Sequence, residues 1–147
     1  MEQQKDYTTS IVVDKTPEEV FNDINHVSGW WHGEIKGDTE KVGDEFTYQM
    51  GDVHFSKQRV IKSIPGKKVV WLVTDSKISF VNDKKEWVDT KIVFAITPEG
   101  DKTRLTFTHQ GLVPAIECYG SCSGTWQNLI GKSLFTYILT GKGVEVF

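Results

Sequence analysis

The chain has 147 residues, 38% apolar side chains and a formal net charge of −3. This length and composition predict one globular domain over residues 1–147 and exclude disordered and collagen-like proteins. The balance of 17 basic against 20 acidic side chains gives no basic surface, so we expect no nucleic-acid partner.

The sequence also bears on the compartment. The first residues, Met1–Asp6, contain no basic region followed by an apolar stretch, so we expect no signal peptide. The weakly charged stretch Cys118–Gly141 contains Lys132 and several Ser, Thr and Gly residues, which is too polar for a membrane span. We therefore expect a cytoplasmic protein without membrane insertion.

The N-terminal elements follow clear signals. The β-branched and aromatic run Tyr7–Val13 predicts a strand. The motif Thr16–Glu19 then predicts a helix, because Thr16 can cap it, Pro17 suits its first turn and Glu19 can complete a capping box. We expect this helix to end near Asn25 or His26, and Ser28–Trp31 to form a second helical turn or a corner.

A run of strands follows, separated by turn signals such as Gly51-Asp52 and Pro65-Gly66. Another turn is expected at Pro98–Asp101. The expected strands are Glu34–Lys36, Glu45–Met50, Val53–Ile64, Val69–Thr74, Lys77–Val81, Glu86–Thr97 and Lys102–Gln110.

The last predicted element is a long helix that ends at Gly141 and Gly143. Apolar residues at three- and four-residue spacing predict its buried stripe, which comprises Tyr119, Cys122, Trp126, Leu129, Ile130, Ser133, Tyr137 and Ile138. Because strands and helices are segregated along the chain, the fold class is α+β with one antiparallel sheet.

Such a sheet curls, so a helix lying across it can leave a space between the two. Small residues near the helix start, from Gly120 to Gly124, would face Tyr48, His54 and His109 on the sheet. This arrangement favours an apolar pocket with a few hydrogen-bonding groups. An ordinary close-packed core explains the same pattern equally well.

Several segments in this order resemble a known superfamily. They are Thr16–Phe21 followed by Trp30-Trp31, Val42–Phe46, the stretch from Val60 through Ile64-Pro65-Gly66 to Trp71, and Thr103–Gly111 followed by a helix with Trp126, Leu134 and Gly141–Gly143. The chain resembles the START-like (SRPBCC) superfamily, and more closely the family named after the activator of the heat-shock-protein-90 ATPase.

The resemblance implies a helix-grip fold, in which a curved antiparallel sheet wraps around a long C-terminal helix and two short N-terminal helices close one end. Members of the superfamily include lipid and hormone carriers, cyclases and a chaperone regulator. The resemblance therefore implies a cavity but no single activity.

We expect the chain to bind a small apolar ligand, lipid-like or polyketide-like, in this cavity, without cofactor. The expected ligand-binding residues are Trp30, Tyr48, His54, Trp71, Phe94, Phe107, His109, Tyr119, Cys122 and Trp126. One of Trp30 and Trp31 would pack on the sheet and the other would lie at the pocket mouth.

Two alternatives remain. The first is a cyclase or dehydratase in which His54 or His109 moves a proton, although a structural, hydrogen-bonded histidine explains the same residues. The second is a chaperone-interacting module. A homodimer is also possible, because the last helix carries few charges.

Other reactive residues have plainer explanations. His26 and His32 lack further ligands at a spacing that zinc requires, so we expect no metal site. Cys122 is expected to act as a small buried apolar residue. Arg59 is expected at an exposed strand position.

Overall fold

In this computed structural model, the structure describes residues 6–31, 33–51, 54–78, 87–113 and 119–144. The seven strands are β1 (Tyr7–Val13), β2 (Glu34–Gly37), β3 (Glu45–Met50), β4 (His54–Ile64), β5 (Lys68–Ile78), β6 (Lys91–Glu99) and β7 (Lys102–Gln110). The helices are α1 (Pro17–Asn25), α2 (Val27–Trp30), α3 (Tyr119–Asn128), the π-helical segment η1 (Leu129–Leu134) and α4 (Phe135–Thr140).

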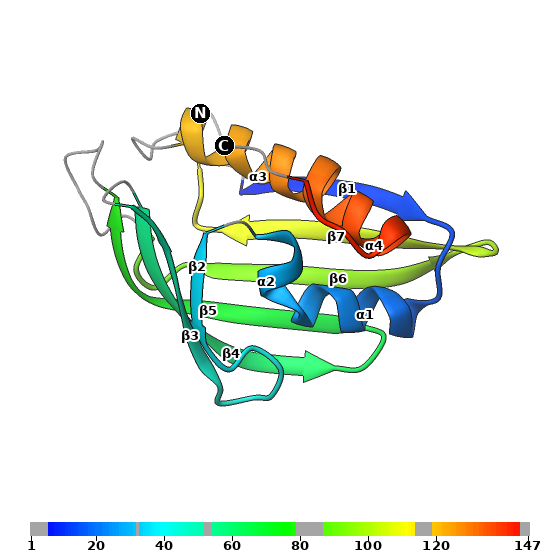
Figure 1. Ribbon diagram of the computed structural model, residues 1–147, viewed down its shortest axis with the longest axis horizontal. Helices are drawn as coiled ribbons and strands as arrows, with labels where there is room; N and C mark the ends of the chain where they lie inside the picture. The colour runs from blue at the N-terminus through cyan, green and yellow to red at the C-terminus, as the bar shows by residue number, and fades with distance from the viewer. Residues whose placement is uncertain (1–5, 32, 52–53, 79–86, 114–118, 145–147) are drawn as a thin grey trace, which may run out of the picture.

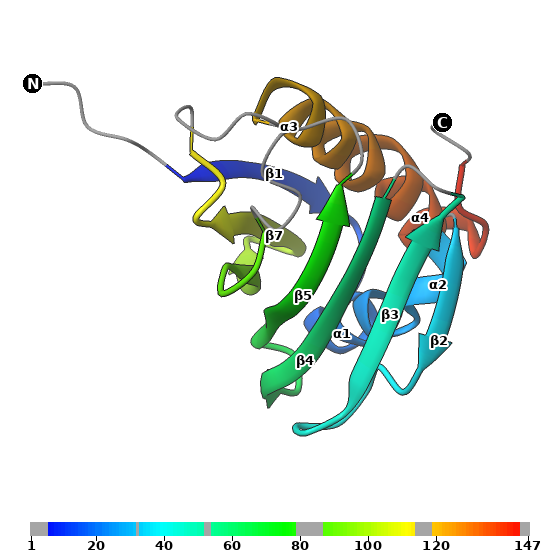
Figure 2. The ribbon, with the colours of Figure 1, turned by 90° about the vertical axis from the view of Figure 1, so that its left-hand side faces the viewer.

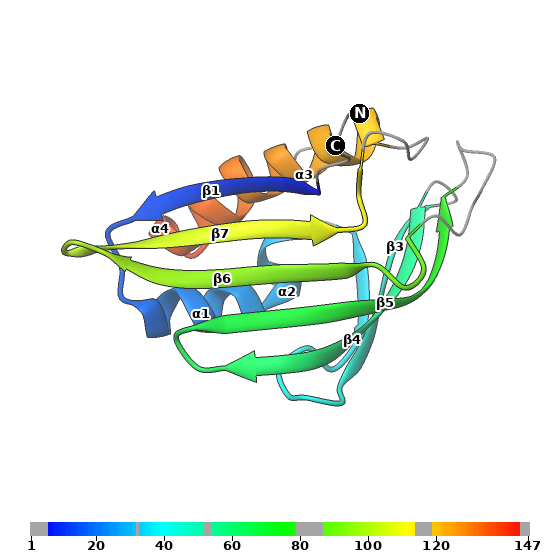
Figure 3. The ribbon, with the colours of Figure 1, turned by 180° about the vertical axis from the view of Figure 1, so that it is seen from behind.

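The strands form one antiparallel sheet in the order β1-β7-β6-β5-β4-β3-β2. All helices lie on one face of this sheet, with α3, η1 and α4 forming one long rod next to β1 and β7 (Figure 1). The sheet curves around the helices (Figure 2), and none of the helices that the structure describes lies on its other face (Figure 3). This is the expected α+β helix-grip fold.

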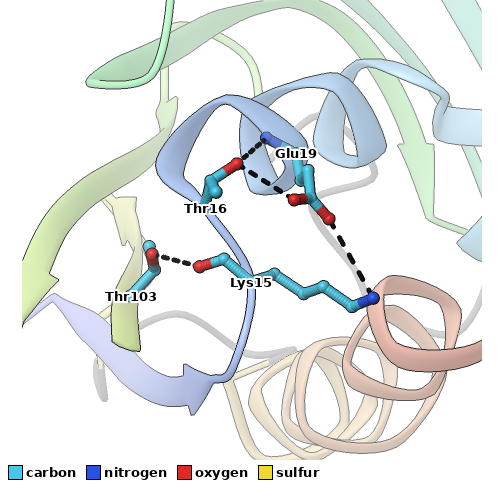
Figure 4. Close-up of polar contacts among 4 residues, drawn as sticks. All are labelled: Lys15, Thr16, Glu19 and Thr103. Carbon is cyan, nitrogen blue, oxygen red and sulfur yellow. Dashed lines mark hydrogen bonds and ion pairs between the residues drawn. The ribbon is translucent and has the colours of Figure 1, made fainter. Parts of the chain in front are cut away.

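The start of α1 forms as its sequence predicts. Thr16 Oγ accepts a hydrogen bond of 3.2 Å from the Glu19 backbone N–H, and Pro17 occupies the first turn. The Thr16 hydroxyl also donates to the Glu19 carboxylate, which lies 4.0 Å from Lys15 Nζ. Thr103 of β7 donates to the Lys15 carbonyl and so attaches this corner to the sheet (Figure 4).

Three strand predictions need correction. Val69–Thr74 and the first residues of Lys77–Val81 belong to the single strand β5, which continues past a bulge between Lys57 and Gln58 in its pairing with β4. Positions 79–81 lie outside the described residues, as does Val53, which was expected to begin the strand before β5.

The strand predicted from Glu86 begins only at Lys91, because Trp87–Asp89 form a turn in which Asp89 has a φ of 69°. Glu86 lies outside the described residues. At the other end, Pro98 and Glu99 continue β6 instead of turning. They pair only with β7, since the pairing of β5 with β6 stops at Ala95, and a proline without an N–H is tolerated there.

The C-terminal rod keeps the predicted stripe, with Cys122, Trp126, Leu129, Ile130, Ser133 and Ile138 buried and Tyr119 and Tyr137 partly buried. The π-helical segment was not predicted. Its buried residues are Leu129, Ile130, Ser133 and Leu134. Gly141 ends the rod with a φ of 82°, as expected. None of the helices in the described ranges is long and apolar enough to cross a bilayer.

Candidate functional site

The face of the sheet that the helices cover carries polar side chains in its middle. Alternate residues of β4 point to this inner face, and among them Ser56 and Gln58 have no solvent exposure. The strand register places Ser56 next to the equally buried Ser76 of β5, and His54 next to Ile78. We call His54, Ser56, Gln58 and Ser76 the polar strip.

Aromatic rings surround this strip. Trp31, which follows α2, stacks on Tyr48 of β3 with ring centroids 4.2 Å apart. Trp126 of α3 lies 5.1 Å from Trp31, and its ring is nearly parallel to that of Trp87 at 5.8 Å. The site therefore combines residues from the sheet, the corner after α2, the turn before β6 and the C-terminal rod.

His109 of β7 is held by hydrogen bonds on both ring nitrogens. Trp126 Nε1–H donates to His109 Nδ1 at 3.1 Å, so Nε2 carries the proton and donates to Thr90 Oγ1 at 2.8 Å. The Thr90 hydroxyl in turn donates to the Trp87 carbonyl. Burial, with a smaller contribution from His54, lowers the pKa of His109 to about 3. The imidazole is therefore a neutral structural link between β7 and α3.

His54 at the start of β4 has a different environment. Its ring makes T-shaped contacts with two aromatic rings. The ring centroids are 4.5 Å apart for Trp87 and 5.5 Å apart for Tyr48. Its Nε2 is buried and has no hydrogen-bond partner, and burial lowers the pKa of the imidazole to about 4. At neutral pH this side chain is an uncharged, unpaired hydrogen-bonding group.

Three more buried polar atoms around the strip lack a partner. They are Gln58 Oε1, Trp71 Nε1 and Trp87 Nε1. Buried polar groups in proteins are nearly always hydrogen-bonded, and an unpaired one costs about 1–3 kcal/mol. Four such atoms therefore lie in one interior region with their hydrogen-bonding capacity unused.

The predicted ligand-binding residues come together in this region, although their role in binding stays a prediction. Tyr48, His54, Trp71, His109 and Trp126 belong to one network of ring contacts. Trp30, Phe94 and Phe107 extend it, with Phe107 4.6 Å from Trp126. Cys122 is 5% exposed, as expected of a buried apolar residue, and Tyr119 is partly buried at the start of α3.

Some predicted details were wrong. Gly120 and Gly124 are exposed on α3 and do not face the sheet. Trp30 and Trp31 are both buried, so neither lies at a surface opening. Arg59 is exposed as expected, and its guanidinium lies 3.5 Å from the Glu45 carboxylate on the outer face.

Four site residues were not predicted from the sequence, namely Ser56, Gln58, Ser76 and Trp87. The first two share the phase of His54 on an alternating strand, so that pattern was sufficient to place them on the inner face. Ser76 could not be placed because the bulge shifts the phase of β5. Trp87 was assigned to a strand, whereas it lies in a turn.

The space predicted between sheet and helix stays a prediction. In the described part of the interface between the sheet and the C-terminal rod, aromatic rings fill the space at the distances given above. Two hollows lined wholly by described residues lie elsewhere on the surface, one of about 430 Å³ at residues 37–44 and one of about 320 Å³ near Lys15 and Thr103.

Comparison with known proteins agrees with this architecture. The family model of activator of Hsp90 ATPase homolog 1-like proteins matches residues 14–138. No curated protein sequence is significantly similar to the chain.

Several solved structures share the fold. The solution structure of the Aha1 dimer from Colwellia psychrerythraea has a TM-score of 0.76 at 22% identity, covering 95% of this chain and 99% of that one. SSP2350 from Staphylococcus saprophyticus has a TM-score of 0.71 at 13% identity, covering 97% and 98%. DynU16, from the dynemicin biosynthetic locus, has a TM-score of 0.68 at 17% identity, and the match covers 94% of this chain but 48% of DynU16. At these identities the likeness concerns the fold.

Proposed function

The chain belongs to the activator of Hsp90 ATPase homolog 1-like family, and on that premise we propose that it binds a small, mainly apolar ligand between the sheet and the C-terminal rod. The observation that supports this most directly is the set of four unpaired buried polar atoms, on His54, Gln58, Trp71 and Trp87. They lie among aromatic rings, which supply apolar surface for a ligand.

Among the rings of the site, Trp87 is the one that a ligand can displace with the least loss of hydrogen bonds and secondary structure. Its indole N–H has no partner, and the residue belongs to a turn, not to a strand or helix. Trp126, by contrast, is attached to His109 through its indole N–H. We infer that a ligand moves the Trp87 ring aside and takes over its contacts with His54.

The energy available is moderate. Burying roughly 200 Å² of ligand surface yields about 5 kcal/mol before the costs of association are subtracted. Displacing the Trp87 ring reduces the net gain further. From burial alone we therefore expect dissociation constants of about 0.2 mM or weaker, and higher affinity only where the ligand also satisfies unpaired polar atoms.

An uncharged fluorescent probe, N-phenyl-1-naphthylamine, tests the proposal. We expect saturable binding to one site with increased probe fluorescence. In a two-dimensional ¹H–¹⁵N spectrum, the indole N–H signal of Trp87 should shift, because its ring moves. The five indole signals can be assigned with single Trp→Phe variants.

The matched control is a signal from the same side-chain type outside the strip. Trp30 Nε1–H donates to the Ile24 carbonyl, so its signal should move less than that of Trp87. Non-saturable fluorescence, or binding that leaves every indole signal in place, would contradict an interior site.

The enzyme alternative has less support at His109, because both of its ring nitrogens are engaged and its pKa is about 3. Turnover by this side chain at neutral pH would need both hydrogen bonds to break. The chaperone-interaction and homodimer alternatives have the family description and the dimeric Colwellia structure in their favour. Light scattering and binding to a purified heat-shock protein 90 distinguish them from ligand carriage, since neither readout depends on what fills the interior.

A further inference from the structure

We propose that the site is built for an uncharged ligand with a hydroxyl group, which hydrogen-bonds to the Gln58 carboxamide within the polar strip. The inference rests on the proposed interior site and specifies its ligand class: neutral alcohols and phenols, as opposed to carboxylates or amines.

The geometry around Gln58 supports a hydrogen-bonding subsite. Gln58 is fully buried on the inner face, and its register partners are Phe46 on β3 and Val73 on β5. Its Nε2 donates to Ser56 Oγ at 2.5 Å, which uses only part of the capacity of the amide. Its Oε1 has no partner. A buried carboxamide with one unsatisfied pole, placed between apolar neighbours, can accept one more hydrogen bond.

The chemistry of an amide favours a hydroxyl group as the missing partner. With Nε2 donating to Ser56, the unpaired atom of the amide is Oε1, an acceptor that needs a donor. If the amide is flipped by 180°, Ser56 donates to Oε1, and the unpaired atom is then Nε2, a donor. A hydroxyl group can donate or accept, so it satisfies Gln58 in both orientations.

The electrostatics of the interior exclude an ionised ligand. Every fully or nearly buried polar residue that the structure describes is uncharged, namely Asn25, Ser56, Gln58, Ser76, Thr90, Thr103, His109 and Ser133. The depressed pKa of about 4 keeps His54 neutral at pH 7. A buried carboxylate or ammonium group without a counter-charge is strongly unfavourable.

Three probes of similar shape test the ligand class: naphthalene, 2-naphthol and 2-naphthoate, with affinities measured at pH 7 through quenching of tryptophan fluorescence. We expect 2-naphthol to bind about 5–10-fold more tightly than naphthalene, as one additional hydrogen bond allows. We expect 2-naphthoate to bind at least about 10-fold more weakly than 2-naphthol.

The variant Gln58→Met then tests whether the preference for 2-naphthol over naphthalene depends on Gln58. It should reduce the affinity for 2-naphthol to that for naphthalene and leave naphthalene binding unchanged. The matched control is Gln110→Met, the same change at an exposed position at the end of β7, which should retain the preference. In the wild-type protein, the side-chain amide signal of Gln58 should shift with 2-naphthol and not with naphthalene, which tests the contact even if the variant fails to fold.

The outcomes separate this inference from the proposed function. If naphthalene itself does not bind, the interior site is wrong and the inference falls with it. If naphthalene binds but 2-naphthol has no advantage, or 2-naphthoate binds equally well, only the assignment of the ligand class is overturned. A preference that survives in a folded Gln58→Met variant, or a Gln58 amide signal unmoved by 2-naphthol, also overturns it.

Discussion

The hydrogen bonds from Trp126 through His109 and Thr90 to the Trp87 carbonyl connect residues from three separate parts of the chain. His109 supplies one acceptor and one donor, and each meets a complementary group. A histidine in a ligand-binding protein is easily taken for a catalytic base. Here the pairing of both nitrogens supports a structural role, one of the two explanations that the sequence left open.

Removal of the Thr90 hydroxyl tests that role. Thr90→Val keeps the shape but leaves the buried His109 Nε2–H without an acceptor, so we expect a loss of about 1–3 kcal/mol in the free energy of unfolding. Chemical denaturation measures it. The control is Thr106→Val, the same change on the outer face of β7, for which we expect a change within about 0.5 kcal/mol. Equal effects at the two positions would argue against the structural link.

The two buried histidines also predict an acid-sensitive fold. Their folded-state pKa values of about 4 and about 3 lie below the unfolded value of about 6.5, so the unfolded chain binds more protons between these limits. Their contribution to stability is complete above pH 6.5 and is lost as the pH falls. Each of the two histidines should lower the free energy of unfolding by about 2 kcal/mol when the pH falls from 7.5 to 5.0.

The variant His54→Phe should remove about half of this pH-dependent loss, as measured by urea unfolding at the two pH values. The rings that face His54 are those of Tyr48 and Trp87, and a protonated His54 also disfavours protonation of His109. His26→Phe, at an exposed position, serves as the control and should retain the full loss. An unchanged pH dependence in His54→Phe would show that this imidazole is not held neutral.

At the scale of elements, the edge strand β2 depends on close approach to β3. Gly37 has a φ of 108°, and a Cβ there would lie within 2.9 Å of Phe46 Cα and even closer to the Glu45 carbonyl. Only glycine fits this position. Gly43 has a similar φ of 95°, but a Cβ there would meet no atom within 4 Å.

The two glycines therefore separate backbone strain from steric overlap. We expect Gly43→Ala to cost about 1–3 kcal/mol through its positive φ alone. Gly37→Ala should cost more and should also increase amide hydrogen exchange in β2, because the strand must move away from β3. Equal losses of stability, with β2 still protected, would contradict the overlap.

The elements also show what can be predicted from sequence and what cannot. Residues 16–25 formed the expected capped helix because capping, proline and apolar spacing are local signals that agree. The turn at Trp87–Asp89 was missed because its alternating pattern resembles a strand, and the left-handed Asp89 is set by pairing with Val73. The π-helical segment was missed because residues 129–134 continue the three- and four-residue apolar spacing of an α-helix.

For the whole molecule, the fold could be predicted because strand segregation and a family resemblance agreed along the chain. The site could be predicted only in part. Aromatic residues and histidines attracted attention, whereas Gln58 matters through the missing hydrogen-bond partner of its Oε1, which only three-dimensional neighbours reveal.

The strand order has a consequence for how the chain folds. β1 lies at one edge of the sheet and pairs along its whole length with β7, so that Tyr7 meets His109. During synthesis, the first strand therefore has to wait for its partner until most of the chain has left the ribosome. Such distant pairing slows folding, and a chaperone that shields the β-branched N-terminal segment in the meantime would reduce aggregation.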